Sequence, residues 1–172
     1  MSHWDESEGR FGIGFFGIVV VQLTVPDAAA AIDFYRAALG ARELYRNQDP
    51  ETGRVYHCEL MVAGARLTLH DEIAEFGLLA PSTIGGTPVG LNVYVDDVDA
   101  AFERAIAAGG TALSEPADYF WGMRSGALLD PFGHRWILST AFEDPSPDEI
   151  LARSHGVSPA MHLSAARKPP KG

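Results

Sequence analysis

The chain has 172 residues, enough for one domain with tails or for two small units that share a core. Hydrophobic residues make up 47% and charged residues 21%, and the formal net charge is −10. With 13 Lys and Arg against 23 Asp and Glu, the chain lacks the basic surplus of a nucleic-acid-binding protein, so we expect no nucleic-acid partner. The single cysteine, Cys58, excludes an intramolecular disulfide and a zinc site built from several cysteines.

The N-terminal extension, residues 1–17, leads into the apolar run "FGIGFFGIVVVQLTV". This run is too short to span a bilayer, is interrupted by Gly12, Gly14 and Gly17, and follows acidic rather than basic residues. We therefore predict a cytoplasmic protein with no membrane partner. The "FGIGFFG" stretch fits a subunit interface and ordinary core packing equally well.

The first unit, residues 18–71, reads as a strand, a helix and three further strands. The predicted helix, 27–39, begins at an Asp cap and ends before Gly40, and it places Ile32, Tyr35 and Leu39 on one core-facing stripe. Alternation of apolar and polar residues predicts the three strands near 43–48, 55–62 and 66–71.

The second unit, residues 88–142, repeats the first after a linker, residues 72–87, that contains "PSTIGGTP". Val25 and Asp27 match Val95 and Asp97 at an offset of 70 residues, and "GARLTL" (64–69) matches "GHRWIL" (133–138) at an offset of 69. The repeat predicts a second helix over 97–108 and strands near 111–116, 124–130 and 134–140.

The last segment, residues 143–172, begins with a helix signal. Ser146, Pro147 and Glu149 form a capping-box pattern that predicts a short helix. After His155 the periodicity is lost and the chain ends in "RKPPKG", so we expect disorder there or attachment to a neighbouring subunit.

The paired units, the helix motif Asp-x-x-x-Ala-Ile-Asp-Phe-Tyr and the closing "DPFGHRW" resemble the vicinal oxygen chelate superfamily. That superfamily includes glyoxalase I, extradiol dioxygenases and bleomycin-resistance proteins. The stretches "HCEL", "LTLHDE" and "FWGMRSGALLDPFGHRWILST" are most similar to its PhnB-like branch. The resemblance spans 18–153 and implies an α+β fold, in which two βαβββ modules form a curved, half-barrel mixed sheet with helices outside.

In metal-dependent members of this superfamily, the first and last strands of each module supply the metal ligands. The resemblance places these positions at Val20, Thr68, Gly90 and Ile137. Val, Gly and Ile cannot coordinate a metal, and a neutral Thr hydroxyl is a poor lone ligand, so we expect no cofactor at this site. His134 has the opposite strand parity to Ile137, which predicts that it points away from the cavity.

Alternate strand residues share a face, and this parity directs a polar set into the predicted cavity. Arg66 and Arg135 occupy equivalent repeat positions, where each could clamp an anion, pair with a nearby carboxylate such as Glu59, or lie at the rim of the cavity. Thr24 shares this parity. The predicted ligand-binding residues on the strands are Gln22, Arg66, Thr68, His70, Asn92, Tyr94, Arg135 and Ser139.

Two further parts of the sequence each allow more than one interpretation. The first is a loop that holds Tyr119, Phe120 and Trp121, and we predict that Phe120 and Trp121 contact the ligand. The same loop could instead cover the edge of the core or form a dimer contact.

A relocated site for a divalent metal ion is the second alternative feature. His57 and Glu59 share strand parity and, with His70, would supply two histidines and a carboxylate. A hydrogen-bonded His–Glu pair on a half-exposed strand is the other interpretation.

Our leading hypothesis is a metal-free protein of the bleomycin-resistance type that sequesters a small molecule, an antibiotic or a toxic metabolite. The alternatives are a metal-dependent lyase, isomerase or dioxygenase of the glyoxalase kind with the relocated site, and a metal-free acid–base enzyme that uses His70 or Tyr94. Related proteins commonly complete their sites across a two-fold axis, so we expect a homodimer.

Overall fold

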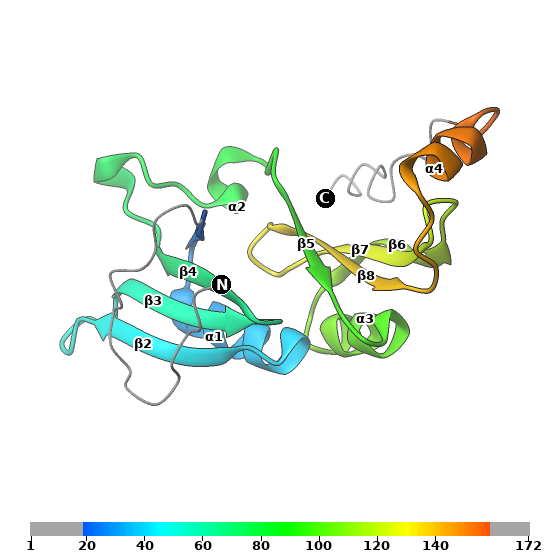
Figure 1. Cartoon of the computed structure of the whole chain (residues 1–172). Helices are drawn as coiled ribbons and strands as arrows, with labels where there is room; N and C mark the ends of the chain where they lie inside the picture. The colour runs from blue at the N-terminus through cyan, green and yellow to red at the C-terminus, as the bar shows by residue number, and fades with distance from the viewer. Residues whose placement is uncertain (1–18, 159–172) are drawn as a thin grey trace.

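The computed structural model describes residues 19–158, which fold into two βαβββ modules (Figure 1). The predictions made for the N-terminal extension and for the end of the basic tail therefore lie outside the described residues. Every helix within 19–158 is too short or too polar to cross a membrane.

The first module forms a four-stranded mixed sheet in the order β1-β4-β3-β2. Strand β1 runs parallel to β4, and the other pairs are antiparallel. The elements are β1 (Val21–Val25), α1 (Ala28–Leu39), β2 (Arg42–Gln48), β3 (Val55–Val62) and β4 (Ala65–Asp71).

The second module has the same topology, with strand order β5-β8-β7-β6. Its elements are β5 (Gly90–Tyr94), α3 (Val98–Ala107), β6 (Thr111–Asp118), β7 (Met123–Leu129) and β8 (Arg135–Ala141). The connecting segment holds a 3-10 turn, Ala74–Phe76, and the short helix α2 (Pro81–Ile84), and the second module is followed by α4 (Pro147–Ser154). The α+β fold with two open mixed sheets confirms the architecture expected from the sequence.

The strand register confirms the internal repeat. Val21 of β1 lies opposite Leu67 of β4, and the equivalent residues of the second module, Leu91 and Trp136, lie opposite each other in the same way. Local signals also act as predicted: Asp27 accepts a hydrogen bond of 2.9 Å from the Ala30 backbone amide and so caps α1.

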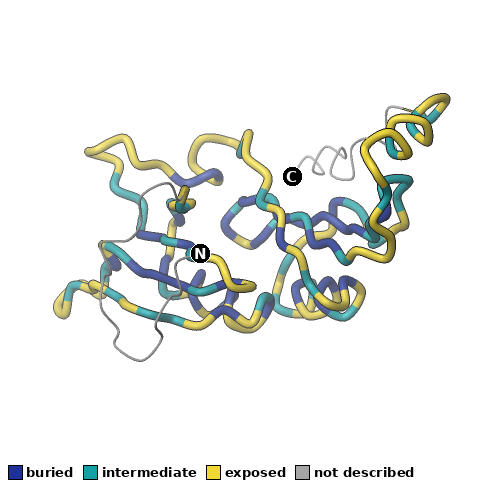
Figure 2. The backbone as a smooth tube through the Cα atoms, viewed as in Figure 1, coloured by how far each residue is buried: buried dark blue, intermediate teal, exposed yellow. Residues whose placement is uncertain are grey.

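The helix-bearing faces of both sheets share one hydrophobic core. Helices α1 and α3 pack against each other, and Tyr35 of α1 contacts Phe132 and Trp136 of the second module. Figure 2 shows the buried backbone running through the strands and the two helices, with exposed chain at the loops and edges. Because both sheets turn these faces toward the common core, their opposite faces point away from it.

His134 belongs to this junction between the modules. Its side chain is 9% exposed, and Nε2 donates a hydrogen bond of 3.0 Å to the backbone oxygen of Thr24 in β1. This contact agrees with the packing position that strand parity predicts for His134.

Candidate functional site

The face of the first sheet that points away from α1 is polar, and we call it the first outer face. At its centre Arg66 Nη1 lies 3.1 Å from Glu59 Oε2, with side chains only 13% and 7% exposed. His57 Nε2 lies 3.4 Å from the other carboxylate oxygen of Glu59. Of the three interpretations that the sequence left open for Arg66, the structure supports pairing with the Glu59 carboxylate. The polar residues that β1, β3 and β4 place on this face are Gln22, Thr24, His57, Glu59, Arg66, Thr68 and His70.

His70 is the most buried polar residue of this face, with 2% of its surface exposed. Its Nδ1 lies 2.8 Å from the carbonyl oxygen of Asp71, which only accepts, so Nδ1 carries the proton in the neutral ring. Nε2 is then the acceptor for the Thr24 hydroxyl at 3.2 Å. In this tautomer both ring nitrogens of His70 have hydrogen-bond partners within its own module.

The second outer face is the corresponding face of the second sheet. Ser139 of β8 and Ser125 of β7 are both buried, and their hydroxyls are 2.8 Å apart. Tyr94, on the edge strand, is 66% exposed and lines a hollow of about 380 Å³ together with Ser139. The residues that β5, β7 and β8 place on this face are Gly90, Asn92, Tyr94, Met123, Ser125, Ala127, Leu129, Arg135, Ile137, Ser139 and Ala141.

The residues at the superfamily's metal positions do not fit a metal ion. A Cβ atom on Gly90 would lie 3.2 Å from Cδ1 of Ile137, so an aliphatic side chain fills the space over the glycine. Thr68 uses its hydroxyl to donate a hydrogen bond of 3.3 Å to the backbone oxygen of Val21. Neither module therefore presents a nitrogen, carboxylate or thiolate ligand at these positions.

The predicted relocated metal site is only partly assembled. His57 and Glu59 are in contact, but Nε2 of His70 faces Thr24. In residues 19–158 no three His, Cys, Asp or Glu side chains are grouped so that they could hold a metal ion.

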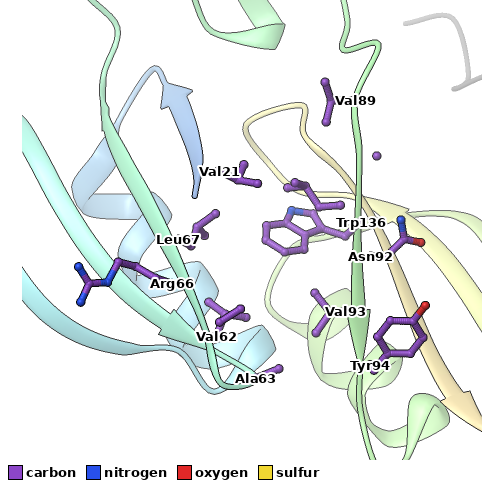
Figure 3. Close-up of a pocket in the computed structure, with 13 residues that line it drawn as sticks. Val21, Val62, Ala63, Arg66, Leu67, Val89, Asn92, Val93, Tyr94 and Trp136 are labelled. Atoms are coloured by element: carbon purple, nitrogen blue, oxygen red, sulfur yellow. The ribbon is translucent and has the colours of Figure 1, made fainter. Parts of the chain in front are cut away.

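An apolar groove separates the two outer faces, and the sequence patterns did not predict it. It has a volume of about 470 Å³ and lies between β1 and β4 of the first module and β5 of the second. In Figure 3 Val21, Leu67 and Trp136 line the groove. Arg66 of the first module and Asn92 and Tyr94 of the second line it as well, with the Arg66 guanidinium and the Tyr94 ring pointing to opposite sides. The groove thus brings three of the residues predicted to share one cup, Arg66, Asn92 and Tyr94, to one cavity, whereas the other polar strand residues of that set lie on the two outer faces.

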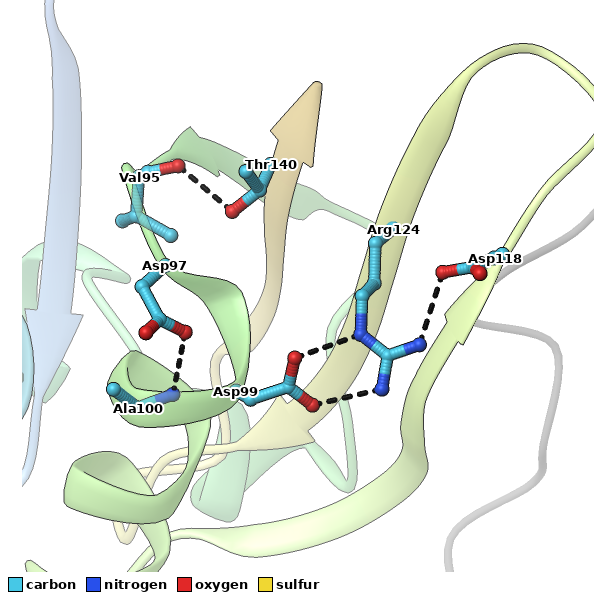
Figure 4. A network of polar contacts seen from close by, with 7 residues as sticks. All are labelled: Val95, Asp97, Asp99, Ala100, Asp118, Arg124 and Thr140. Carbon is cyan, nitrogen blue, oxygen red and sulfur yellow. Dashed lines mark hydrogen bonds and ion pairs between the residues drawn. The ribbon is translucent and has the colours of Figure 1, made fainter. Parts of the chain in front are cut away.

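The charges at the rim of the second sheet are mutually paired. Arg124 of β7 donates to Asp99 over 2.7 and 2.8 Å and to Asp118 over 2.9 Å (Figure 4). Nearby, the Asp97 carboxylate caps α3 through the Ala100 amide, as the sequence predicted. The Arg124 guanidinium is therefore satisfied by two carboxylates of its own chain.

The aromatic loop lies at the turn between β6 and β7. The rings of Tyr119 and Trp121 stack with centroids 4.4 Å apart, and Phe120 meets Trp121 edge-on at 4.9 Å. The loop also contacts the segment that carries α4, because Arg153 donates to the backbone oxygen of Phe120 over 3.3 Å. All three rings are half-buried, and their role toward a ligand stays a prediction.

Two βαβββ modules with four-stranded mixed sheets and polar outer faces define a paired-module fold of the glyoxalase type. The family model for the Glyoxalase/Bleomycin resistance protein/Dioxygenase superfamily matches residues 17–138, and the chain belongs to this superfamily. The finer placement in a PhnB-like branch stays a prediction.

The chain is also similar to individual proteins. The chain is 41% identical over 133 residues to the uncharacterized protein Rv0887c of Mycobacterium tuberculosis, covering 76% of this chain and 78% of that protein. TioX from Micromonospora sp. ML1 is 27% identical, with a TM-score of 0.56 over 75% of this chain and 99% of that one.

A more distant structure shares the fold alone. The fosfomycin resistance protein FosX from Listeria monocytogenes, solved with Mn(II) and sulfate, is 20% identical with a TM-score of 0.57. The match covers 81% of this chain and 98% of FosX.

Proposed function

We propose that this protein binds and sequesters a small molecule, an antibiotic or a toxic metabolite, on its outer faces without using a metal ion. The observation that carries the proposal is the chemistry at Val20, Thr68, Gly90 and Ile137. A metal-dependent relative needs ligating side chains at these positions. In this chain the Ile137 side chain covers Gly90, and the Thr68 hydroxyl already donates a hydrogen bond to the backbone oxygen of Val21.

The polar groups that remain suit recognition better than turnover. Arg66 and Glu59 neutralise each other, and the Ser125–Ser139 pair offers hydroxyl donors and acceptors beside the hollow at Tyr94. Ligand sites are commonly concave and largely apolar, with a few placed polar groups. Gln22, Asn92, Phe120 and Trp121 belong to the same proposal as further ligand contacts.

A screen of natural-product antibiotics by thermal shift, repeated with Ni, Mn, Fe and Zn salts, tests the proposal. We expect ligands that raise the melting temperature equally with and without metal, since a ligand bound only to the folded state stabilises it. Native mass spectrometry of the purified protein should show a co-purifying small molecule and no metal. Divalent metal bound with the protein, or turnover restored by added metal, would contradict the proposal.

We also propose that the protein acts as a homodimer in the cytoplasm. The two outer faces are separated by the apolar groove, so a second copy would bring a first outer face of one protomer against a second outer face of its partner. Sedimentation at micromolar concentration should report a dimer. A monomer at that concentration would contradict the proposed homodimer.

A further inference from the structure

Arg135 is the exception among the arginines on the sheets. Arg66 is paired with Glu59, and Arg124 is held by Asp99 and Asp118. The Nε of Arg135 is buried, and within residues 19–158 it is the one buried side-chain nitrogen or oxygen without a hydrogen-bond partner. Leaving such a donor unpaired is unfavourable, and the great majority of buried polar groups have a partner.

The internal repeat explains why the partner is missing. Glu59 lies opposite Thr68 across β3 and β4, and Ala127 lies opposite Ile137 across β7 and β8. Since Thr68 and Ile137 are equivalent in the repeat, Ala127 occupies the position that holds the carboxylate in the first module. The second module keeps the arginine and replaces its counter-ion with a methyl group.

The groups beside Arg135 on this face are ones that a ligand could contact. Arg135 lies opposite Gly90 across β5 and β8, and the Ile137 and Arg135 side chains cover that glycine, because an added Cβ atom would lie 3.2 Å from Cδ1 of Ile137 and 3.9 Å from Cδ of Arg135. Ile137 forms an apolar floor next along the strand, followed by Ser139 with its hydroxyl partner Ser125. Arg135 and Ser139 are four residues apart on one face, a span of about 13 Å.

We propose that Arg135 anchors an oxyanion of the ligand, a carboxylate, sulfate or phosphate-type group, on the second outer face. The apolar body of the ligand then lies over Ile137, and a hydrogen-bonding group reaches Ser139 near the hollow of about 380 Å³. A guanidinium binds such oxyanions through two parallel hydrogen bonds. The inference rests on the proposed function and specifies its ligand class.

The overall charge of the chain is compatible with this assignment. A net charge of −10 repels anions at long range, but charges further apart than about 8 Å are largely screened at physiological ionic strength. The Arg135 guanidinium can therefore attract an anionic ligand at short range although the protein as a whole is acidic.

Titration with three probes, followed by NMR of the backbone amides at constant ionic strength, tests the proposal. Hexanoate carries the anion and an apolar tail, acetate carries the anion alone, and hexanamide carries the tail alone. We expect hexanoate to bind more tightly than either of the other probes, with shifts centred on β5 and β8. Arg135→Gln should weaken hexanoate by about 10- to 100-fold, the range of a charge-assisted contact, and leave hexanamide unchanged.

A second variant keeps Arg135 but gives its guanidinium a carboxylate partner within the protein. Ala127→Glu recreates the pairing of the first module, so it should abolish hexanoate binding as Arg135→Gln does, whereas Ala127→Gln should retain it. Circular dichroism melts establish that each variant is folded. If Ala127→Glu fails to fold, the comparison of Arg135→Gln with the wild type decides alone.

Equal affinity of wild type and Arg135→Gln for hexanoate would overturn the anion site. A tight neutral or cationic ligand from the antibiotic screen that is insensitive to Arg135→Gln would also overturn it, while small-molecule binding would stand. Failure of every probe and every screened compound to bind would overturn both proposals.

Discussion

The phenol of Tyr35 in α1 donates a hydrogen bond of 2.7 Å to the carboxylate of Asp130, 95 residues further along the chain. The same carboxylate accepts from Trp136 Nε1 at 2.9 Å and from the backbone amides of Phe132 and His134, each at 2.9 Å. Tyr35 is fully buried and Asp130 is 4% exposed. One carboxylate thus ties the first module's helix to the turn that starts β8, the strand that carries Arg135.

Replacing Tyr35 with Phe should lower the free energy of unfolding by about 1.5–3 kcal/mol, because it removes a buried hydrogen bond to a charged acceptor. Tyr56→Phe is the matched control: Tyr56 donates to Asp49 over 3.2 Å, but this contact is solvent-exposed, so its loss should be much smaller. Urea denaturation of the three proteins measures the difference. Equal effects of the two variants would show that the Tyr35–Asp130 contact does not stabilise the module junction.

The Tyr35 contribution should also depend on pH. Burial, and then the neighbouring Asp130 charge, raise the pKa of Tyr35 well above its ordinary value. The folded state therefore holds this proton more tightly than the unfolded state, so the stabilisation is complete below the unfolded pKa of about 10 and is lost at higher pH.

The measurement is the difference in unfolding free energy between wild type and Tyr35→Phe across this range. It should shrink by about 1.4 kcal/mol between neutral pH and pH 11, because only the wild-type unfolded chain gains stability by ionising this phenol. A difference that stays constant up to pH 11 would contradict the assignment.

The fold could be predicted well from the sequence because the signals that set it are local. Asp27, Gly40 and the strand alternation act over a few residues, and the two halves of the repeat imply equivalent strand registers, which the β1–β4 and β5–β8 pairings confirm. The outer-face residues followed from the same parity. The features that could not be predicted depend on how the modules pack: the apolar groove between the modules and the Asp130 junction. The difference in pairing between Arg66 and Arg135 follows from the repeat, because the position that holds Glu59 in the first module holds Ala127 in the second.

Cys58 should be unreactive in the folded protein. It is fully buried in the core, and burial raises the pKa of its thiol to about 12. Because the thiolate is the reactive form, a disulfide reagent at pH 8 should label native Cys58 far more slowly than the urea-unfolded chain. Comparable labelling rates in the two states would mean that β3 opens readily. We also expect no disulfide-linked dimer in the absence of denaturant.

Arg66 and Arg135 should respond oppositely to the same substitution. Arg66→Gln leaves Glu59 buried without its counter-ion, so it should cost about 3–5 kcal/mol of stability, whereas Arg66→Met combined with Glu59→Met should recover most of that loss. Arg135→Gln removes an unpaired cation and should leave the unfolding free energy unchanged or slightly higher. Denaturant melts of the three variants and of the wild type give the comparison. A large decrease in the unfolding free energy with Arg135→Gln would show that Arg135 has a structural partner and is not free to bind a ligand.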